Sequence, residues 1–137
     1  MSDPLELNLT NRMDEIPDAL AAVDRYLHAA GCDESVRFDM ALALDEVLAN
    51  IVGNAYDDGI TGEIAVRIAV TPDAVEAEVS DAGRPFDPLM RAEPDLDATL
   101  EARAVGGLGI HFLRETMQSL RYDRQGGRNS LHMIRKR

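Results

Sequence analysis

Residues 45–54 of this 137-residue chain read Asp45-Glu46-Val47-Leu48-Ala49-Asn50-Ile51-Val52-Gly53-Asn54. An α-helix advances about 3.6 residues per turn, so positions four apart lie on one face. The apolar residues then form a core-facing stripe, and Glu46, Asn50 and Asn54 follow one another on a polar ridge. Alone, such a ridge is as consistent with a solvated face, or with an amide bonded to a neighbouring loop, as with a functional site.

Regular patterns surround this helix on both sides. Apolar residues alternate with polar ones over 5–9, 64–70 and 75–79, which is the period of a half-buried strand. Helical spacing covers 17–31, 33–56 and 110–117, and a closing hairpin is indicated over 120–134. This order differs from the regular strand–helix alternation of a doubly wound parallel sheet. We therefore expect a two-layer α/β sandwich, with helices on one face of a mostly antiparallel, mixed sheet.

The length and the 45% hydrophobic content suit one domain over residues 1–137, with a core that needs no disulfide. Residues 84–105 interrupt the periodicity, because they contain three prolines and many charges. A loop this long in a compact domain is usually functional or disordered. We expect it to be a lid, with a short helix over 96–103.

Charge and cysteine content exclude several classes of protein. Fourteen basic and twenty-five acidic residues give a net charge of −11, which repels a phosphate backbone and disfavours direct nucleic-acid binding. Cys32 is the only cysteine, so no intramolecular disulfide can form. No apolar run approaches the roughly 20 residues that span a membrane, and the start lacks a signal-peptide pattern. We expect a cytoplasmic protein that does not enter a membrane.

Two residues of the ridge have side chains suited to phosphate chemistry. Asn50 can offer a carbonyl oxygen to Mg²⁺, a hard ion that prefers oxygen ligands and shares them with substrate phosphates. Glu46, one turn away, can accept a proton from an attacking hydroxyl or water. Asn54 is more simply explained as a polar surface residue.

A second motif, Asp81-Ala82-Gly83, follows an apolar strand. The carboxylate of Asp81 can emerge at the strand end and accept a hydrogen bond from an exocyclic amine such as that of adenine. Gly83 would let a flat ligand approach the backbone closely. Taken alone, Asp-Ala-Gly is more often an ordinary turn.

A third motif, Gly106-Gly107-Leu108-Gly109, directly precedes a helical stripe. Glycine has no side chain to shield the backbone amides, and the positive end of the helix dipole lies at the same place. Together they favour phosphate binding. The motif matches neither the Walker pattern nor the dinucleotide fingerprint. By itself, a glycine-rich helix start is also a common hinge.

In this order, the three motifs resemble the nucleotide-binding boxes of the GHKL superfamily, the gyrase, histidine kinase and mismatch-repair ATPases that share the Bergerat fold. The likeness spans nearly the whole chain. Two phrases are similar to the bacterial anti-sigma factor serine/threonine kinases in particular: Leu44-Asp45-Glu46-Val47-Leu48-Ala49-Asn50 and Gly106-Gly107-Leu108-Gly109-Ile110.

The resemblance implies an ATP site with Mg²⁺. Glu46 would be the general base, Asn50 the Mg²⁺ ligand and Asp81 the adenine-recognising carboxylate. A hydroxyl on the closing strand often lies near the adenine in that family. Ser130 is the nearest candidate, although Asn129 beside it leaves the register open. The remaining implied nucleotide contacts are Asn54, Gly83, Gly106, Gly107, Leu108 and Gly109.

The resemblance also implies a function. Members of that branch transfer the γ-phosphate of ATP to a serine of a STAS-domain anti-sigma antagonist, sequester a sigma factor, and are usually homodimers. The residues leave two alternatives open. One is an ATP-binding regulator that sequesters its partner without phosphotransfer, and the other is the catalytic half of a two-component histidine kinase that acts in trans.

Overall fold

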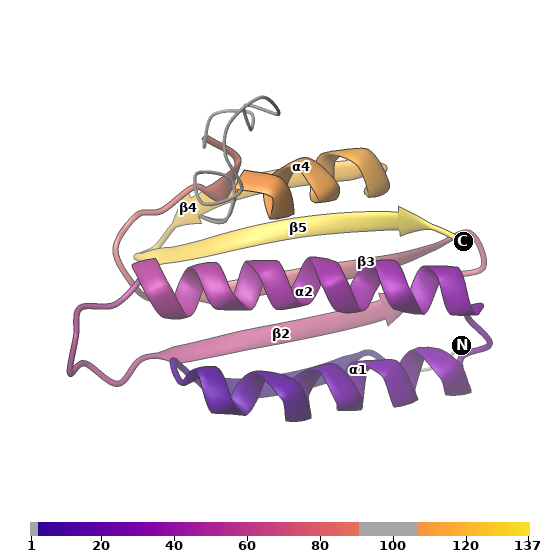
Figure 1. Ribbon diagram of the computed structural model, residues 1–137, viewed down its shortest axis with the longest axis horizontal. Helices are drawn as coiled ribbons and strands as arrows, with labels where there is room; N and C mark the ends of the chain where they lie inside the picture. The colour runs from indigo at the N-terminus through magenta and orange to yellow at the C-terminus, as the bar shows by residue number, and fades with distance from the viewer. Residues whose placement is uncertain (1–2, 91–106) are drawn as a thin grey trace.

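The computed structural model describes residues 3–90 and 107–137, which form two layers (Figure 1). One layer is a sheet of five strands in the order β1-β2-β3-β5-β4, and every neighbouring pair is antiparallel. The expected two-layer sandwich is confirmed, with no parallel pair among the described strands. The strands are β1 (Leu5–Thr10), β2 (Glu63–Val70), β3 (Ala74–Asp81), β4 (Ser119–Gln125) and β5 (Arg128–Lys136).

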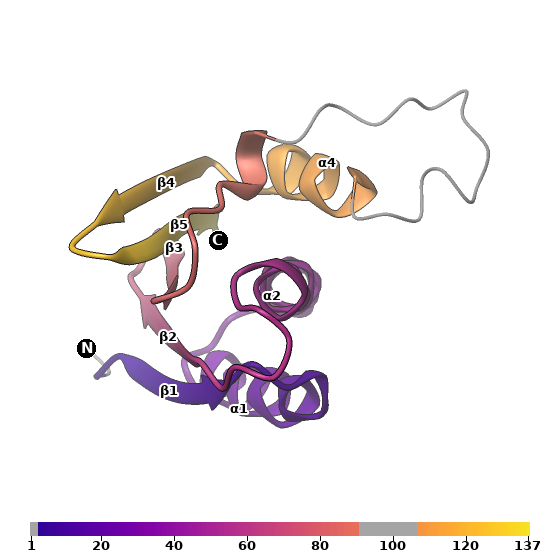
Figure 2. The ribbon, with the colours of Figure 1, turned by 90° about the vertical axis from the view of Figure 1, so that its left-hand side faces the viewer.

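The second layer consists of helices that all cover the same face of the sheet (Figure 2). They are α1 (Ile16–Ala29), α2 (Glu34–Asn54) and α4 (Gly107–Thr116), with two short 3-10 turns, η1 (Met13–Glu15) and η2 (Pro88–Met90). Helix α2 lies between α1 and α4, and its buried side chains include Leu44, Val47 and Leu48. The polar ridge of Glu46, Asn50 and Asn54 therefore belongs to the middle helix of this layer.

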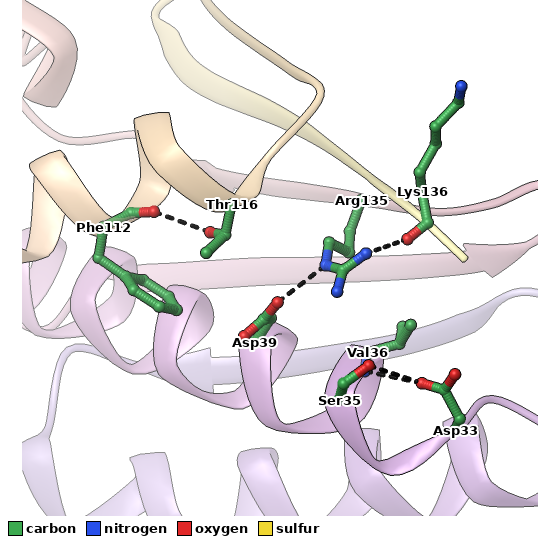
Figure 3. A network of polar contacts seen from close by, with 8 residues as sticks. All are labelled: Asp33, Ser35, Val36, Asp39, Phe112, Thr116, Arg135 and Lys136. Atoms are coloured by element: carbon green, nitrogen blue, oxygen red, sulfur yellow. Dashed lines mark hydrogen bonds and ion pairs between the residues drawn. The ribbon is translucent and has the colours of Figure 1, made fainter.

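Helix α2 begins at Glu34, close to where the sequence indicates, and Asp33 is its N-cap. The backbone amide of Val36 donates to Asp33 Oδ1 (3.1 Å), and the hydroxyl of Ser35 donates to the same oxygen (3.0 Å) (Figure 3). This N-cap satisfies an amide that the first helical turn leaves without a partner. The two donors hold the pKa of Asp33 below its usual value, with the Val36 amide as the main cause.

An ion pair connects the two layers at the same end of the molecule. Arg135 Nε of β5 lies 2.9 Å from Asp39 Oδ2 of α2, and both side chains are about four-fifths buried (Figure 3). The core between the layers is apolar, with Met40, Leu44 and Met133 fully buried. The ion pair and this core together hold α2 against the sheet.

Strand register decides which side chains meet the helices. Asp81, the last residue of β3, pairs with Asn129 of β5, and both side chains are buried on the helical side of the sheet. Successive side chains of a strand point to opposite faces, so Ser130 belongs to the open face. There it pairs with Ser80, whose hydroxyl accepts a hydrogen bond from Arg128 (3.1 Å).

Part of the expected lid and of the glycine motif cannot be compared with the structure. Residues 91–105, including the short helix expected over 96–103, and Gly106 lie outside the described residues. In the part that the structure describes, no helix combines the length and the apolar character that crossing a membrane would require.

Candidate functional site

The three sequence motifs meet at one end of α2, in two groups. We call Asp81, Gly83 and Asn129 the base end, where base means a nucleobase. We call Glu46, Asn50 and Gly109 the phosphate end. A narrow pocket extends from the base end to Asn50. Its described lining is largely apolar and consists of Val47, Asn50, Ile51, Val79, Asp81, Phe86, Pro88, Tyr122, Asn129, Ser130 and Leu131.

The carboxylate of Asp81 is the central acceptor of the base end. Asp81 is only 2% exposed, and its Oδ1 accepts hydrogen bonds from the Gly83 amide (2.9 Å) and from Asn129 Nδ2 (3.0 Å). Within residues 3–90 and 107–137, no hydrogen bond involves the other oxygen, Oδ2. Although the residue is buried, Oδ2 is not a fully enclosed atom, so it can accept a hydrogen bond from a ligand.

Asn129, the neighbour of the predicted Ser130, is the residue of β5 whose side chain bonds to Asp81. The side chain of Asn129 lies on the helical face of the sheet, as does that of Asp81. Ser130 also borders the pocket, but as the next residue of β5 its side chain belongs to the opposite, open face. The role of the Ser130 hydroxyl beside the base therefore stays a prediction. The apolar residues Leu131 and Met133, both buried, carry the signal that could have placed Asn129 inside.

Gly83 is required for a reason that the sequence did not indicate. A Cβ on Gly83 would overlap the backbone carbonyl of Ala55, just beyond the end of α2. The neighbouring Arg84 amide donates to that same Ala55 oxygen (2.8 Å). Gly83 therefore allows β3 and the end of α2 to approach each other, and close approach of a ligand is not needed to explain it.

At the phosphate end, Glu46 and Asn50 lie one turn apart and interact. Asn50 Nδ2 donates to Glu46 Oε1 (3.2 Å), and Asn50 is 8% exposed. A Cβ on Gly109 would overlap the Glu46 carboxylate, so this carboxylate rests against the first turns of α4. The structure thus brings Glu46, Asn50 and Gly109 together across two helices.

Three further predicted site residues, Gly107, Leu108 and Asn54, lie in α4 and α2. Gly107 and Leu108 are the first residues of α4, where free amides and the helix dipole favour an anion. Asn54 Nδ2 donates to the Asn50 backbone carbonyl (2.9 Å), which accounts for its polarity within α2. Its role as a nucleotide contact stays a prediction.

The residues present can supply only part of the coordination of Mg²⁺, so they fit an ion that is shared with the phosphates of a nucleotide. Among the described residues, no group of three or more His, Cys, Asp or Glu side chains could hold a metal. Asn50 Oδ1 accepts no hydrogen bond in the described part of the chain and can serve as one hard oxygen ligand. This donor set suits an ion that arrives with nucleotide phosphates and keeps several waters.

Comparisons with known proteins agree with the motifs. Residues 9–135 match the model of the histidine kinase-like ATPase domain. The chain is 31% identical over 130 residues to the serine/threonine-protein kinase BtrW of Bordetella bronchiseptica, covering 95% of this chain and 90% of that protein. It is 29% identical over 121 residues to the serine-protein kinase RsbW of Listeria monocytogenes, covering 85% and 76% respectively.

Other relatives are longer than the matched region. With RsbW of Bacillus subtilis the identity is 30% over 94 residues, which is 65% of this chain and 58% of that protein. A solved structure of the RsbU and RsbW domains of a Mycobacterium tuberculosis protein has the same fold, with a TM-score of 0.67 at 19% identity. It covers 98% of this chain and 32% of that chain. The chain belongs to the histidine kinase-like ATPase domain family, part of the GHKL superfamily, and has the RsbW and BtrW serine kinases among its relatives.

Proposed function

We propose that this protein is an ATP-dependent serine kinase and anti-sigma regulatory factor. It phosphorylates a STAS-domain anti-sigma antagonist and sequesters a sigma factor or an analogous partner, as a cytoplasmic homodimer without direct contact to DNA. Relatives named as serine kinases support the activity. The observation that carries the proposal is the Glu46 carboxylate, held by Asn50 and resting against the start of α4.

ATP recognition would use both ends of the site. Asp81 Oδ2 can accept a hydrogen bond from the exocyclic amine of adenine, while the apolar lining of the pocket contacts the ring. The amides at the start of α4 would hold the phosphates. Asn50 Oδ1 would hold Mg²⁺, which neutralises phosphate charge when it is bound.

Glu46 would then act as the general base. Its carboxylate accepts the proton of the partner's serine hydroxyl as the serine oxygen forms a bond to the γ-phosphorus. The bond between that phosphorus and the bridging oxygen breaks, and ADP leaves. Asn50 donates to Glu46 Oε1, which orients the carboxylate and leaves Oε2 to receive the proton.

The experiment that tests the proposal is phosphate transfer from labelled ATP to STAS-domain proteins of the host. We expect Glu46→Gln to lower transfer by about 10²- to 10⁴-fold, the usual contribution of a general base, while ATP affinity stays unchanged. Asp45→Asn is the matched control, because Asp45 is the exposed neighbouring carboxylate of α2. Equal transfer by Glu46→Gln and wild type would remove Glu46 from this role. A wild type that binds ATP and a sigma factor without transfer would favour the regulator that acts by sequestration alone.

A further inference from the structure

The side-chain amide of Asn129 uses its whole hydrogen-bonding capacity. Nδ2 donates to Asp81 Oδ1 (3.0 Å) and to the Arg84 carbonyl (2.8 Å). Oδ1 accepts from the Phe86 amide (3.3 Å) and from the Tyr122 hydroxyl. An asparagine can make at most four such bonds, and Asn129 is 4% exposed. This single side chain therefore joins β3, β4, β5 and the segment that follows β3.

The partners also fix which way the amide faces. A backbone N–H can only donate and a backbone carbonyl can only accept, so Phe86 requires the oxygen of Asn129 and Arg84 requires its nitrogen. A flipped amide would lose both bonds and would turn its oxygen toward the Asp81 carboxylate. The nitrogen that faces Asp81 is thus set by two surrounding backbone groups, of Phe86 and Arg84, rather than by Asp81 itself.

The carboxylate of Asp81 is in turn left with one usable oxygen. Asn129 and the Gly83 amide both donate to Oδ1, and no described group donates to Oδ2. Without Asn129, the carboxylate would keep a single donor and could rotate about its terminal torsion, which is broad for aspartate. Either oxygen, or a water, could then face the pocket.

We propose that Asn129 is a positioning residue that sets base specificity, because it holds Asp81 so that a single fixed oxygen meets the base. The proposal rests on the proposed binding of ATP. A fixed acceptor favours adenine, whose exocyclic amine donates, and disfavours guanine, which presents a carbonyl oxygen at the corresponding position. A rotating, partly hydrated carboxylate would discriminate less between the two.

Discrimination between nucleotides tests this role in the full chain. The probes are Mg-ATP, Mg-GTP and purine riboside triphosphate, an ATP analogue without the exocyclic amine, each measured by calorimetric titration. We expect wild type to prefer ATP over the analogue by about tenfold to hundredfold, the value of a hydrogen bond to a charged group. In Asn129→Ser this preference should fall to about threefold or less, mainly through weaker ATP binding.

Two further variants keep the test decisive. Tyr122→Phe removes only the hydroxyl that donates to Asn129 Oδ1, and should give an intermediate preference even if Asn129→Ser does not fold. Asn8→Ser is the matched control, because Asn8 is an exposed strand residue of β1, and it should keep the wild-type preference.

A purely structural role of Asn129 would weaken ATP and the analogue equally. An unchanged preference in Asn129→Ser, or in Tyr122→Phe where the serine variant does not fold, therefore overturns the inference. That outcome leaves the proposed function intact, because wild type still binds ATP. A wild type that binds none of the three nucleotides overturns both.

Discussion

At the base end, Asp81 is 2% exposed and accepts two hydrogen bonds on one oxygen from the described residues. At the phosphate end, Glu46 is half-buried and accepts one from them, donated by Asn50. The base end is built from strand termini that pair in register, so its side chains are held by backbone and buried amides. The phosphate end is built from the Glu46 and Asn50 side chains of α2 and from Gly109 of α4, against which Glu46 rests. We infer that changes at the base end cost stability as well as binding, while changes at the phosphate end cost mainly catalysis.

The two glycines of the site show the same difference. A Cβ on Gly83 would meet backbone atoms of Ala55, which cannot move without displacing the end of α2. A Cβ on Gly109 would meet the end of the Glu46 side chain, which can rotate away. Alanine at position 83 should therefore lower mainly the stability of the fold, and alanine at position 109 should lower mainly the rate of phosphate transfer.

The largest expected effect is that of Gly109→Ala on phosphate transfer. The new methyl group displaces the Glu46 carboxylate, so transfer should fall by about 100-fold or more, within the usual range of a lost general base. Stability should change by less than about 1 kcal/mol, because alanine is the better helix former. Labelled-phosphate transfer and urea unfolding of the same preparation check the two parts.

A double variant shows whether Gly109 acts through Glu46. If it does, Gly109→Ala combined with Glu46→Gln should transfer phosphate no more slowly than Glu46→Gln alone, because both remove the same base. Independent, multiplying losses would assign Gly109 a separate role, such as holding the phosphates.

The next effect concerns Asp81→Asn and ATP binding. The variant keeps Oδ1 as an acceptor for Gly83 and Asn129, but it replaces Oδ2 by an amide that donates. Wild type should gain about 2.7 kcal/mol of stability at an ATP concentration of 100 times its Kd, and the variant should lose most of this gain. Thermal unfolding with and without Mg-ATP measures it. Equal shifts in both proteins would exclude Asp81 as the base acceptor.

Gly83→Ala should lower stability without ligand by about 1–3 kcal/mol, the usual cost of forcing a methyl group into a packed site. Gly53→Ala is the matched control, because beyond the local backbone of α2 no described atom lies within 4 Å of its Cβ position. That control should gain about 0.5–1 kcal/mol. Urea unfolding of both variants against wild type gives the comparison, and a Gly83→Ala as stable as wild type would show that the end of α2 yields easily.

Local patterns in the sequence predicted the elements of the fold, and long-range contacts decided the details of the site. Alternation over 64–70 and 75–79 indicates strands because side chains alternate across a sheet, and the structure confirms both. The choice between Asn129 and Ser130 depends on the register of β5 with β3, a pairing between residues 48 positions apart in the sequence, which no local turn sets.

The glycines could be recognised from the sequence, but their partners could not. Gly83 lies 28 positions beyond Ala55 in the sequence, and Gly109 lies 63 beyond Glu46, so no local pattern reports either approach. The sequence explained both glycines by a ligand. In the structure, each is already required by contacts within the protein.

The smallest expected effect lies at the other end of α2, away from both parts of the site. Asp33→Ala removes the N-cap acceptor for Val36, so stability should fall by less than for Gly83→Ala, while ATP affinity stays unchanged. Asp33→Asn keeps a capping oxygen and is the control.

Folding lowers the pKa of Asp33, mainly through the Val36 amide, so its ionised form stabilises the fold above the usual aspartate pKa of about 4. This contribution should be lost as the pH falls through the lowered value. The stability difference between wild type and Asp33→Ala, measured by urea unfolding from pH 7 to pH 3, should therefore be constant near neutrality and shrink in acid. A difference that grows in acid would contradict the lowered pKa.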